Sequence, residues 1–139
     1  MYSNGADVIY HAAGGSGNGL FTEAINRAKN GDNVWVIGVD QDQFKEGSWE
    51  GGNVTLTSMI KRVNEAVYQV AEKSFNGNFP GGETLEFGLD VDGVGIAESK
   101  DNVPESSLQI VEEYKQKIIN KEIIVPKSDK EYEEYLESL

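Results

Sequence analysis

Residues 8–19 read VIYHAAGGSGNG and decide the fold class of this 139-residue chain. The first half of this stretch is an apolar run typical of a buried strand, and the glycine-rich second half is typical of a tight turn. From Leu20 onward, apolar residues recur at helical spacing, with Asn18 placed to cap the helix and Gly31 placed to end it. The order strand, loop, helix is the beginning of a βαβ unit.

A second apolar run, NVWVIGVD at residues 33–40, predicts the next strand of the same unit. The crossover makes the two strands parallel and covers both faces of their sheet with helices, so we expect an α/β fold with three layers. A polar, glycine-rich loop follows at residues 41–53. We then expect a short strand at 54–56 and a long helix with an apolar stripe over 58–77.

The remaining third of the chain continues this mixture of strands and helices. Alternating polar and apolar residues at 83–89 predict a half-exposed or edge strand, with residues 94–97 continuing it or pairing with it. Pro104 is placed to start another helix, and the β-branched run at 123–125 is a plausible last strand. A tail helix is expected within residues 126–139, where the letters SDKE fit a capping box.

Composition limits the classes of partner. Twelve basic residues against 24 acidic ones give a formal charge of −12, which repels nucleic acid and anionic membrane surfaces. The absence of cysteine excludes disulfides and thiolate chemistry and leaves the compartment open. No apolar stretch approaches the roughly 20 residues of a membrane span. The first seven residues lack a signal-peptide pattern and run almost directly into a strand, so we expect the beginning of a parent protein to be missing.

The ends of the two predicted strands are the first candidates for a ligand site, because parallel α/β sheets bind ligands beyond the carboxyl ends of their strands. Glycines at 14–19 let backbone N–H groups approach a ligand closely, and the following helix start offers a partial positive charge. The same glycines also fit a plain turn between strand and helix. The loop alone leaves both interpretations open.

Asp40 stands where the second strand ends, and its carboxylate is suited to accept two hydrogen bonds from a vicinal diol such as that of ribose. An acid about 20 residues after a glycine loop is also the arrangement of a dinucleotide-binding domain. Leu20 stands where that fingerprint needs its third glycine or an alanine, so the match is partial. Asp40 and Asp42 also fit solvated loop acids.

Neither metal binding nor catalysis is expected. The acid pairs at 40–42 and 90–92 lack the further oxygen ligands of a calcium loop. His11 is the only histidine, and a catalytic triad would have to recruit Ser16 from its own loop, which is sterically cramped. We expect His11 to hydrogen-bond backbone or ligand rather than act as a base.

Two further side chains are ligand candidates. Tyr10, near the end of the first strand, can stack on a nucleobase, although core packing explains it almost as well. Lys61 comes early in the predicted helix, where a cation opposes the helix dipole unless a ligand or a carboxylate uses it.

Several ordered segments resemble one known family. They are residues 5–9 (GADVI), 12–19 (AAGGSGNG), 36–43 (VIGVDQDQ) and 56–61 (LTSMIK), followed by 79–82, 87–89, 94–96 and 123–126. Together they resemble the basic membrane protein family, lipoproteins that include a purine nucleoside receptor. The likeness covers nearly the whole chain, and several ordered motifs are far more specific than one glycine loop.

The resemblance implies a type I periplasmic-binding fold, in which two α/β lobes hold a purine nucleoside for an ABC importer without covalent chemistry or a cofactor. The chain looks like the C-terminal lobe and tail of such a protein, extracytoplasmic and lipid-anchored in its parent. By matching position, Tyr10 stacks on the base, Asp40 binds the ribose hydroxyls and Lys61 reaches the ligand. The backbone at Gly14 and Gly15 lines the same cleft.

We expect the N-terminal lobe, the signal peptide and the lipid-attachment cysteine that the resemblance implies to belong to a longer parent protein, outside the sequence given. In a type I fold, the helix expected at 58–77 crosses to the other lobe, so we expect its apolar stripe to cause self-association, swapping of elements or repacking of the helix here. Two other functions stay open. One is a dinucleotide-binding oxidoreductase fragment, and the other is a ligand-sensing module with the same fold.

Overall fold

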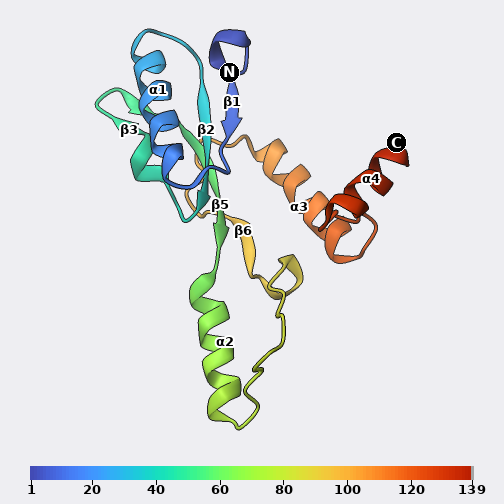
Figure 1. Ribbon diagram of the computed structural model, residues 1–139. Helices are drawn as coiled ribbons and strands as arrows, with labels where there is room; N and C mark the ends of the chain where they lie inside the picture. The colour runs from blue at the N-terminus through green and yellow to red at the C-terminus, as the bar shows by residue number, and fades with distance from the viewer. Residues whose placement is uncertain (139) are drawn as a thin grey trace. The chain divides into compact units, whose positions relative to one another are not determined.

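The computed structural model describes residues 1–138, which fall into two compact units that divide between Pro104 and Glu105. The first unit holds a four-stranded sheet with the helices α1 and α2, and the second holds α3 and α4 (Figure 1). The strand ends singled out in the sequence all belong to the first unit.

The main sheet contains β1 (Val8–Tyr10), β2 (Trp35–Asp40), β5 (Thr55–Lys61) and β6 (Val94–Ile96), in that order across the sheet. β1, β2 and β5 are parallel, whereas β6 runs antiparallel to β5. The predicted α/β class with a parallel sheet is therefore confirmed. Three parallel strands bring their carboxyl ends to one edge, which is where the candidate ligand residues stand.

Helix α1 (Gly17–Lys29) packs its apolar stripe against one face of this sheet. Phe21 and Ala24 on the helix are almost fully buried and share one core cluster with Ile9 and Val36 on the strands. Full burial of a side chain the size of valine or phenylalanine contributes about 1.5–3 kcal/mol to folding. The contact therefore fixes the strand, loop and helix that surround the glycine segment.

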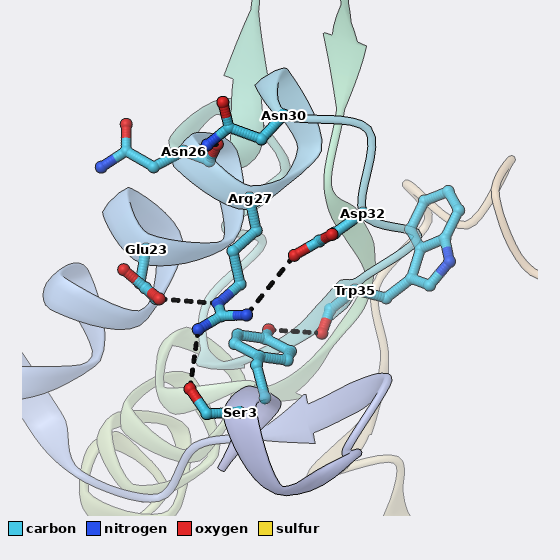
Figure 2. Close-up of polar contacts among 8 residues, drawn as sticks. Ser3, Glu23, Asn26, Arg27, Asn30, Asp32 and Trp35 are labelled. Carbon is cyan, nitrogen blue, oxygen red and sulfur yellow. Dashed lines mark hydrogen bonds and ion pairs between the residues drawn. The ribbon is translucent and has the colours of Figure 1, made fainter.

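Tyr2 and Arg27 lie at the opposite end of the strands, where β2 begins. The Tyr2 hydroxyl donates a hydrogen bond to the carbonyl oxygen of Trp35 (2.8 Å), and the guanidinium carbon of Arg27 lies 5.6 Å from the centre of the Tyr2 ring. Burial raises the pKa of Tyr2 to about 12. Figure 2 shows Arg27 reaching Glu23 (2.6 Å) on its own helix and Asp32 (3.4 Å) in the next loop.

The strand expected at residues 54–56 is longer in the structure, because β5 continues to Lys61. Ser58 is fully buried within it, and its hydroxyl oxygen accepts a hydrogen bond from the backbone N–H of Gln43 (3.0 Å). A polar side chain that is satisfied in this way is compatible with a buried strand.

The helix expected over 58–77 is α2 (Val63–Phe75), since β5 takes up the first four of the expected residues. Lys61 therefore ends a strand and does not oppose a helix dipole, contrary to the prediction. Much of the apolar stripe of α2 is open to solvent, with Val67 63% exposed. A hollow of about 470 Å³ lies along it, lined by Ala66, Val67, Val70, Ala71, Ser74 and Phe79.

The strand predicted at residues 83–89 does not form, and β6 at Val94–Ile96 pairs with β5 instead. The chain before β6 closes a tight turn, in which the backbone N–H of Gly93 donates to the carbonyl oxygen of Gly88 (2.8 Å). A short hairpin, β3 (Ser48–Trp49) with β4 (Gly52–Asn53), forms within the predicted glycine-rich loop.

The second unit contains α3 (Glu105–Ile119) and α4 (Asp129–Glu137). The predicted cap at Ser128 is confirmed, because its Oγ accepts a hydrogen bond from the backbone N–H of Glu131 (3.3 Å). The second bond of a capping box differs, since the Glu131 carboxylate accepts from the backbone N–H of Lys127 and not from that of Ser128. Residues 123–125 are not a strand, contrary to the prediction. Leu139, the last residue of the predicted tail helix, lies outside the described residues. Within residues 1–138, none of the helices has the length and apolar character that crossing a bilayer requires.

Candidate functional site

Three predicted ligand residues are the last residues of three neighbouring parallel strands. Tyr10 ends β1, Asp40 ends β2 and Lys61 ends β5. β2 lies between the other two strands, and Tyr10 pairs in register with Ile37 while Asp40 pairs with Ile60. The topology therefore brings one aromatic ring, one acid and one base to a single edge of the sheet.

Asp40 and Lys61 form an ion pair at this edge, with 2.8 Å between Lys61 Nζ and Asp40 Oδ1. The hydrogen bond to Asp40 and the charge of that carboxylate raise the pKa of Lys61 above its ordinary value, and the Tyr10 phenol adds to the effect. Each side chain of the pair is about half exposed (55% for Asp40 and 53% for Lys61), so both remain open to a ligand.

The backbone of Asp40 adopts a left-handed conformation with φ of 72°. It is the central residue of a three-residue turn, which is closed by a hydrogen bond from the N–H of Gln41 to the carbonyl oxygen of Val39 (2.9 Å). A residue other than glycine in such a turn is strained by about 1–3 kcal/mol. In this conformation the Asp40 carboxylate reaches Lys61 Nζ on the neighbouring strand, and the conformation persists only because the surrounding structure holds it.

Buried polar residues lie directly behind Asp40. The side-chain oxygen Oε1 of Gln43 accepts hydrogen bonds from the backbone N–H of Val39 (2.8 Å) and from His11 Nε2 (2.9 Å). His11 is buried and contacts the Phe21 ring edge-on, with 5.8 Å between ring centres. Its partner is therefore a side chain, whereas the sequence predicted backbone or ligand. No hydrogen-bond partner for His11 Nδ1 occurs among residues 1–138.

Gly14 and Gly15 lie in a 3-10 turn (Gly14–Ser16) between β1 and α1. A Cβ added to either glycine would have no atom of the described residues within 4 Å, so this backbone faces open space beside the strand ends. Helix α1 begins at Gly17, and Ser16 at the cap position makes no side-chain cap, so the predicted Asn18 cap is wrong. The backbone N–H of Gly17, the first of α1, donates instead to the carbonyl oxygens of Gly14 and Gly15, so the turn itself caps the helix.

Gly17 has a packing role that the sequence did not reveal. A Cβ at this position would lie 2.2 Å from Cε1 of His11, so only glycine lets α1 approach the ring. Gly38 in β2 acts similarly, because a Cβ there would lie 2.5 Å from Ser58 Oγ and 2.9 Å from Gln43 Oε1. Isolated glycines inside a strand and at a helix start are the sequence signal for such close approaches.

The remaining acid of this region, Asp42, faces its own loop. Its Oδ1 accepts a hydrogen bond from the backbone N–H of Phe44 (3.0 Å), which matches the alternative of a local loop acid. Asp40 does not share that environment, because it is paired with Lys61. Asp42 thus stabilises its own loop, whereas Asp40 bonds to a neighbouring strand.

A family model described as "ABC transporter substrate-binding protein PnrA-like" matches residues 1–129. The chain is 53% identical over 133 residues to a CD4+ T-cell-stimulating antigen of Listeria monocytogenes, which covers 91% of the chain and 37% of that protein. It is 41% identical over 134 residues to the ABC transporter nucleoside-binding protein BmpA of Lactococcus lactis, with 91% and 38% covered. The chain thus spans well under half the length of these curated relatives.

Among solved structures, the chain is similar to a solute-binding protein of an ABC transporter system from Aeropyrum pernix K1. The TM-score is 0.73 at 25% sequence identity, and the similarity covers 99% of this chain and 45% of the other. This similarity agrees with one lobe of a type I periplasmic-binding fold.

Proposed function

We propose that this chain, which belongs to the family of PnrA-like ABC transporter substrate-binding proteins, forms the C-terminal lobe of a larger binding protein. The complete protein captures a purine nucleoside reversibly for import. The parent protein is extracytoplasmic and lipid-anchored, it delivers its ligand to an ABC permease, and it makes or breaks no covalent bond.

One observation carries the proposal: Tyr10, Asp40 and Lys61 end three adjacent parallel strands, with the last two 2.8 Å apart. In the proposed complex, Tyr10 stacks on the base, since an aromatic ring that is 47% exposed offers a face to a flat ligand. The Asp40 carboxylate accepts hydrogen bonds from the two ribose hydroxyls, and Lys61 donates to an oxygen of the ligand.

The glycine turn supplies the rest of this half of the cleft. Gly14 and Gly15 have open space on the side where a Cβ would stand, so a ligand can approach their backbone closely. Their N–H groups and the start of α1 attract polar oxygens rather than apolar surface.

The exposed face of α2 fits a role in joining two lobes. In this proposal α2 packs on the N-terminal lobe of the complete protein, which covers the hollow along Ala66, Val70 and Phe79. In the 139-residue chain the same surface drives self-association.

The experiment is an NMR titration of the 139-residue chain with inosine, guanosine, adenosine and NAD at millimolar concentrations, because half of a cleft binds weakly. We expect the purine nucleosides to shift the amide signals of Tyr10, Gly15 and Asp40. If NAD shifts them and the nucleosides do not, the chain is a dinucleotide-binding module. If neither does, the strand-end site is wrong.

A further inference from the structure

We infer that Gln43 is a positioning residue: it holds Asp40 in its left-handed turn and thereby sets how strongly the site distinguishes a ribose diol from a sugar without one. This inference rests on the proposed function for the identity of the ligand. Gln43 itself is buried (8% exposed), so it acts through Asp40 and does not touch the ligand.

Gln43 is bonded to β2, to β5 and to the residue that directly follows β1, and each of these strands ends in a candidate ligand residue. Its Oε1 accepts from His11, which directly follows Tyr10, and from the N–H of Val39, which directly precedes Asp40. Its backbone N–H donates to Oγ of Ser58, three residues before Lys61. One residue therefore ties together the strand ends that carry the aromatic ring, the acid and the base.

The turn at Asp40 requires such a stabilising contact. A φ of 72° is unfavourable for a residue with a Cβ, and the turn itself contributes one hydrogen bond, from Gln41 to Val39. The bond from the Val39 N–H to Gln43 anchors the chain immediately before the strained residue. Without it, Asp40 can relax toward an extended conformation, which turns its carboxylate toward the other side of the strand.

The neighbourhood of Gln43 is built around its side chain. Gly38 leaves room for Gln43, and Gly17 leaves room for the His11 ring that donates to it, because an added Cβ would clash in both places. The backbone N–H of Val39 can only donate, so the atom of Gln43 that faces it is the oxygen. His11 Nε2 must then be the donor in its own bond to that oxygen.

The test compares binding of inosine and 2′,3′-dideoxyinosine to the unsubstituted chain and to Gln43→Met, which keeps the length of the side chain and removes its acceptor. We expect the preference for inosine to fall at least fivefold in Gln43→Met, while affinity for dideoxyinosine changes less than twofold. Gln43→Glu keeps a side-chain oxygen that can accept both hydrogen bonds, so it should retain more of the preference than Gln43→Met does.

Gln41→Met is the matched control, because it makes the same change at an exposed glutamine two residues away, and it should leave the preference unchanged. Should Gln43→Met fail to fold, Ser58→Ala removes one bond of the network and should lower the preference by a smaller factor. The inference is overturned if Gln43→Met folds and prefers inosine over dideoxyinosine as strongly as the unsubstituted chain does. If Gln43→Met does not fold, an unchanged preference for inosine in Ser58→Ala overturns it.

A measurement without ligand separates this inference from the proposed function. A residue with positive φ gives a strong NOE between its own amide and α protons, and we expect that signal at Asp40 in the unsubstituted chain and its loss in Gln43→Met. If the signal behaves in this way but inosine is not preferred over dideoxyinosine, the positioning role stands and the assigned ligand is wrong. If the signal persists in Gln43→Met, the positioning role is wrong whatever the ligand is.

Discussion

Lys61 Nζ lies 2.8 Å from Asp40 Oδ1, so the last residues of two adjacent parallel strands form an ion pair at the edge of the sheet. Both side chains are about half exposed, and exposed ion pairs contribute little to folding stability. The pair matters more for the site, because it holds an acceptor and a donor side by side at the edge where β1 ends in Tyr10.

The raised pKa of Lys61 should depend on Asp40. Asp40→Asn removes the charge and most of the hydrogen-bond strength, so the Lys61 pKa should fall toward its ordinary value, whereas Tyr10→Phe should lower it less. An NMR titration of the lysine side chain measures both. Any stability from the pair is present below the ordinary lysine pKa and is lost as pH rises through the raised value. An unchanged Lys61 pKa in Asp40→Asn would mean that the pair is absent in solution.

Tyr2 should make the stability of the chain fall at high pH. Its pKa is about 12 in the folded chain and about 10 unfolded, so between these values the unfolded state ionises first and gains stability. Tyr2→Phe should flatten this decline in urea unfolding, and it should cost about 1 kcal/mol near neutral pH because the bond to Trp35 is lost. A decline as steep in Tyr2→Phe as in the unsubstituted chain would argue against this cause.

Two glycines of the same loop and helix should respond in opposite directions to alanine. Gly17→Ala places a Cβ 2.2 Å from the His11 ring and should destabilise the chain by about 1–3 kcal/mol through overpacking. Gly19 also lies in α1, but a Cβ added there would have no other atom of the described residues within 4 Å. Gly19→Ala should therefore stabilise the chain by about 0.5–1 kcal/mol through helix propensity. Urea unfolding of both variants checks the pair. Equal effects would show that His11 does not pack on Gly17.

The exposed stripe of α2 should cause self-association of the 139-residue chain. Val67→Lys puts a charge in the middle of this apolar surface and should shift the chain toward monomer in sedimentation velocity. Val125→Lys makes the same change at another exposed valine outside α2 and should leave the distribution unchanged. A chain that is monomeric before any substitution would remove the basis for this prediction.

The first 40 residues were the most predictable part of the fold, because local signals and tertiary packing agree there. Apolar runs in β1 and β2 and the stripe of α1 are periodic and end at glycines, and the βαβ connection then dictates a parallel sheet. The placement of Tyr10 and Asp40 at strand ends followed from the same pattern. The parallel βαβ unit alone predicts that Tyr10 and Asp40 lie at the same edge of the sheet.

Elsewhere, tertiary contacts produced secondary structure that the local sequence pattern did not predict. Residues 57 and 58 are polar and looked like the start of a helix, yet Ser58 is buried in β5 because Gln43 satisfies it from a loop 15 residues earlier. The alternating pattern at 83–89 predicted a strand, but β6 occupies the edge of β5. The contacts of Gln43 were equally hard to predict, since its partners are Val39 on β2, Ser58 on β5 and His11 directly after β1.

The central claim, that Asp40 binds a ribose diol beside Tyr10, is tested most directly by titrating the chain and its Asp40→Asn variant with inosine and 2′,3′-dideoxyinosine, followed by amide shifts. Hydrogen bonds to a charged group contribute about 1.5–3 kcal/mol, so the unsubstituted chain should prefer inosine by roughly tenfold or more. In Asp40→Asn the preference should fall close to one, with stacking on Tyr10 retained. Equal affinity for the two ligands in the unsubstituted chain, or the same preference in both proteins, would contradict the account.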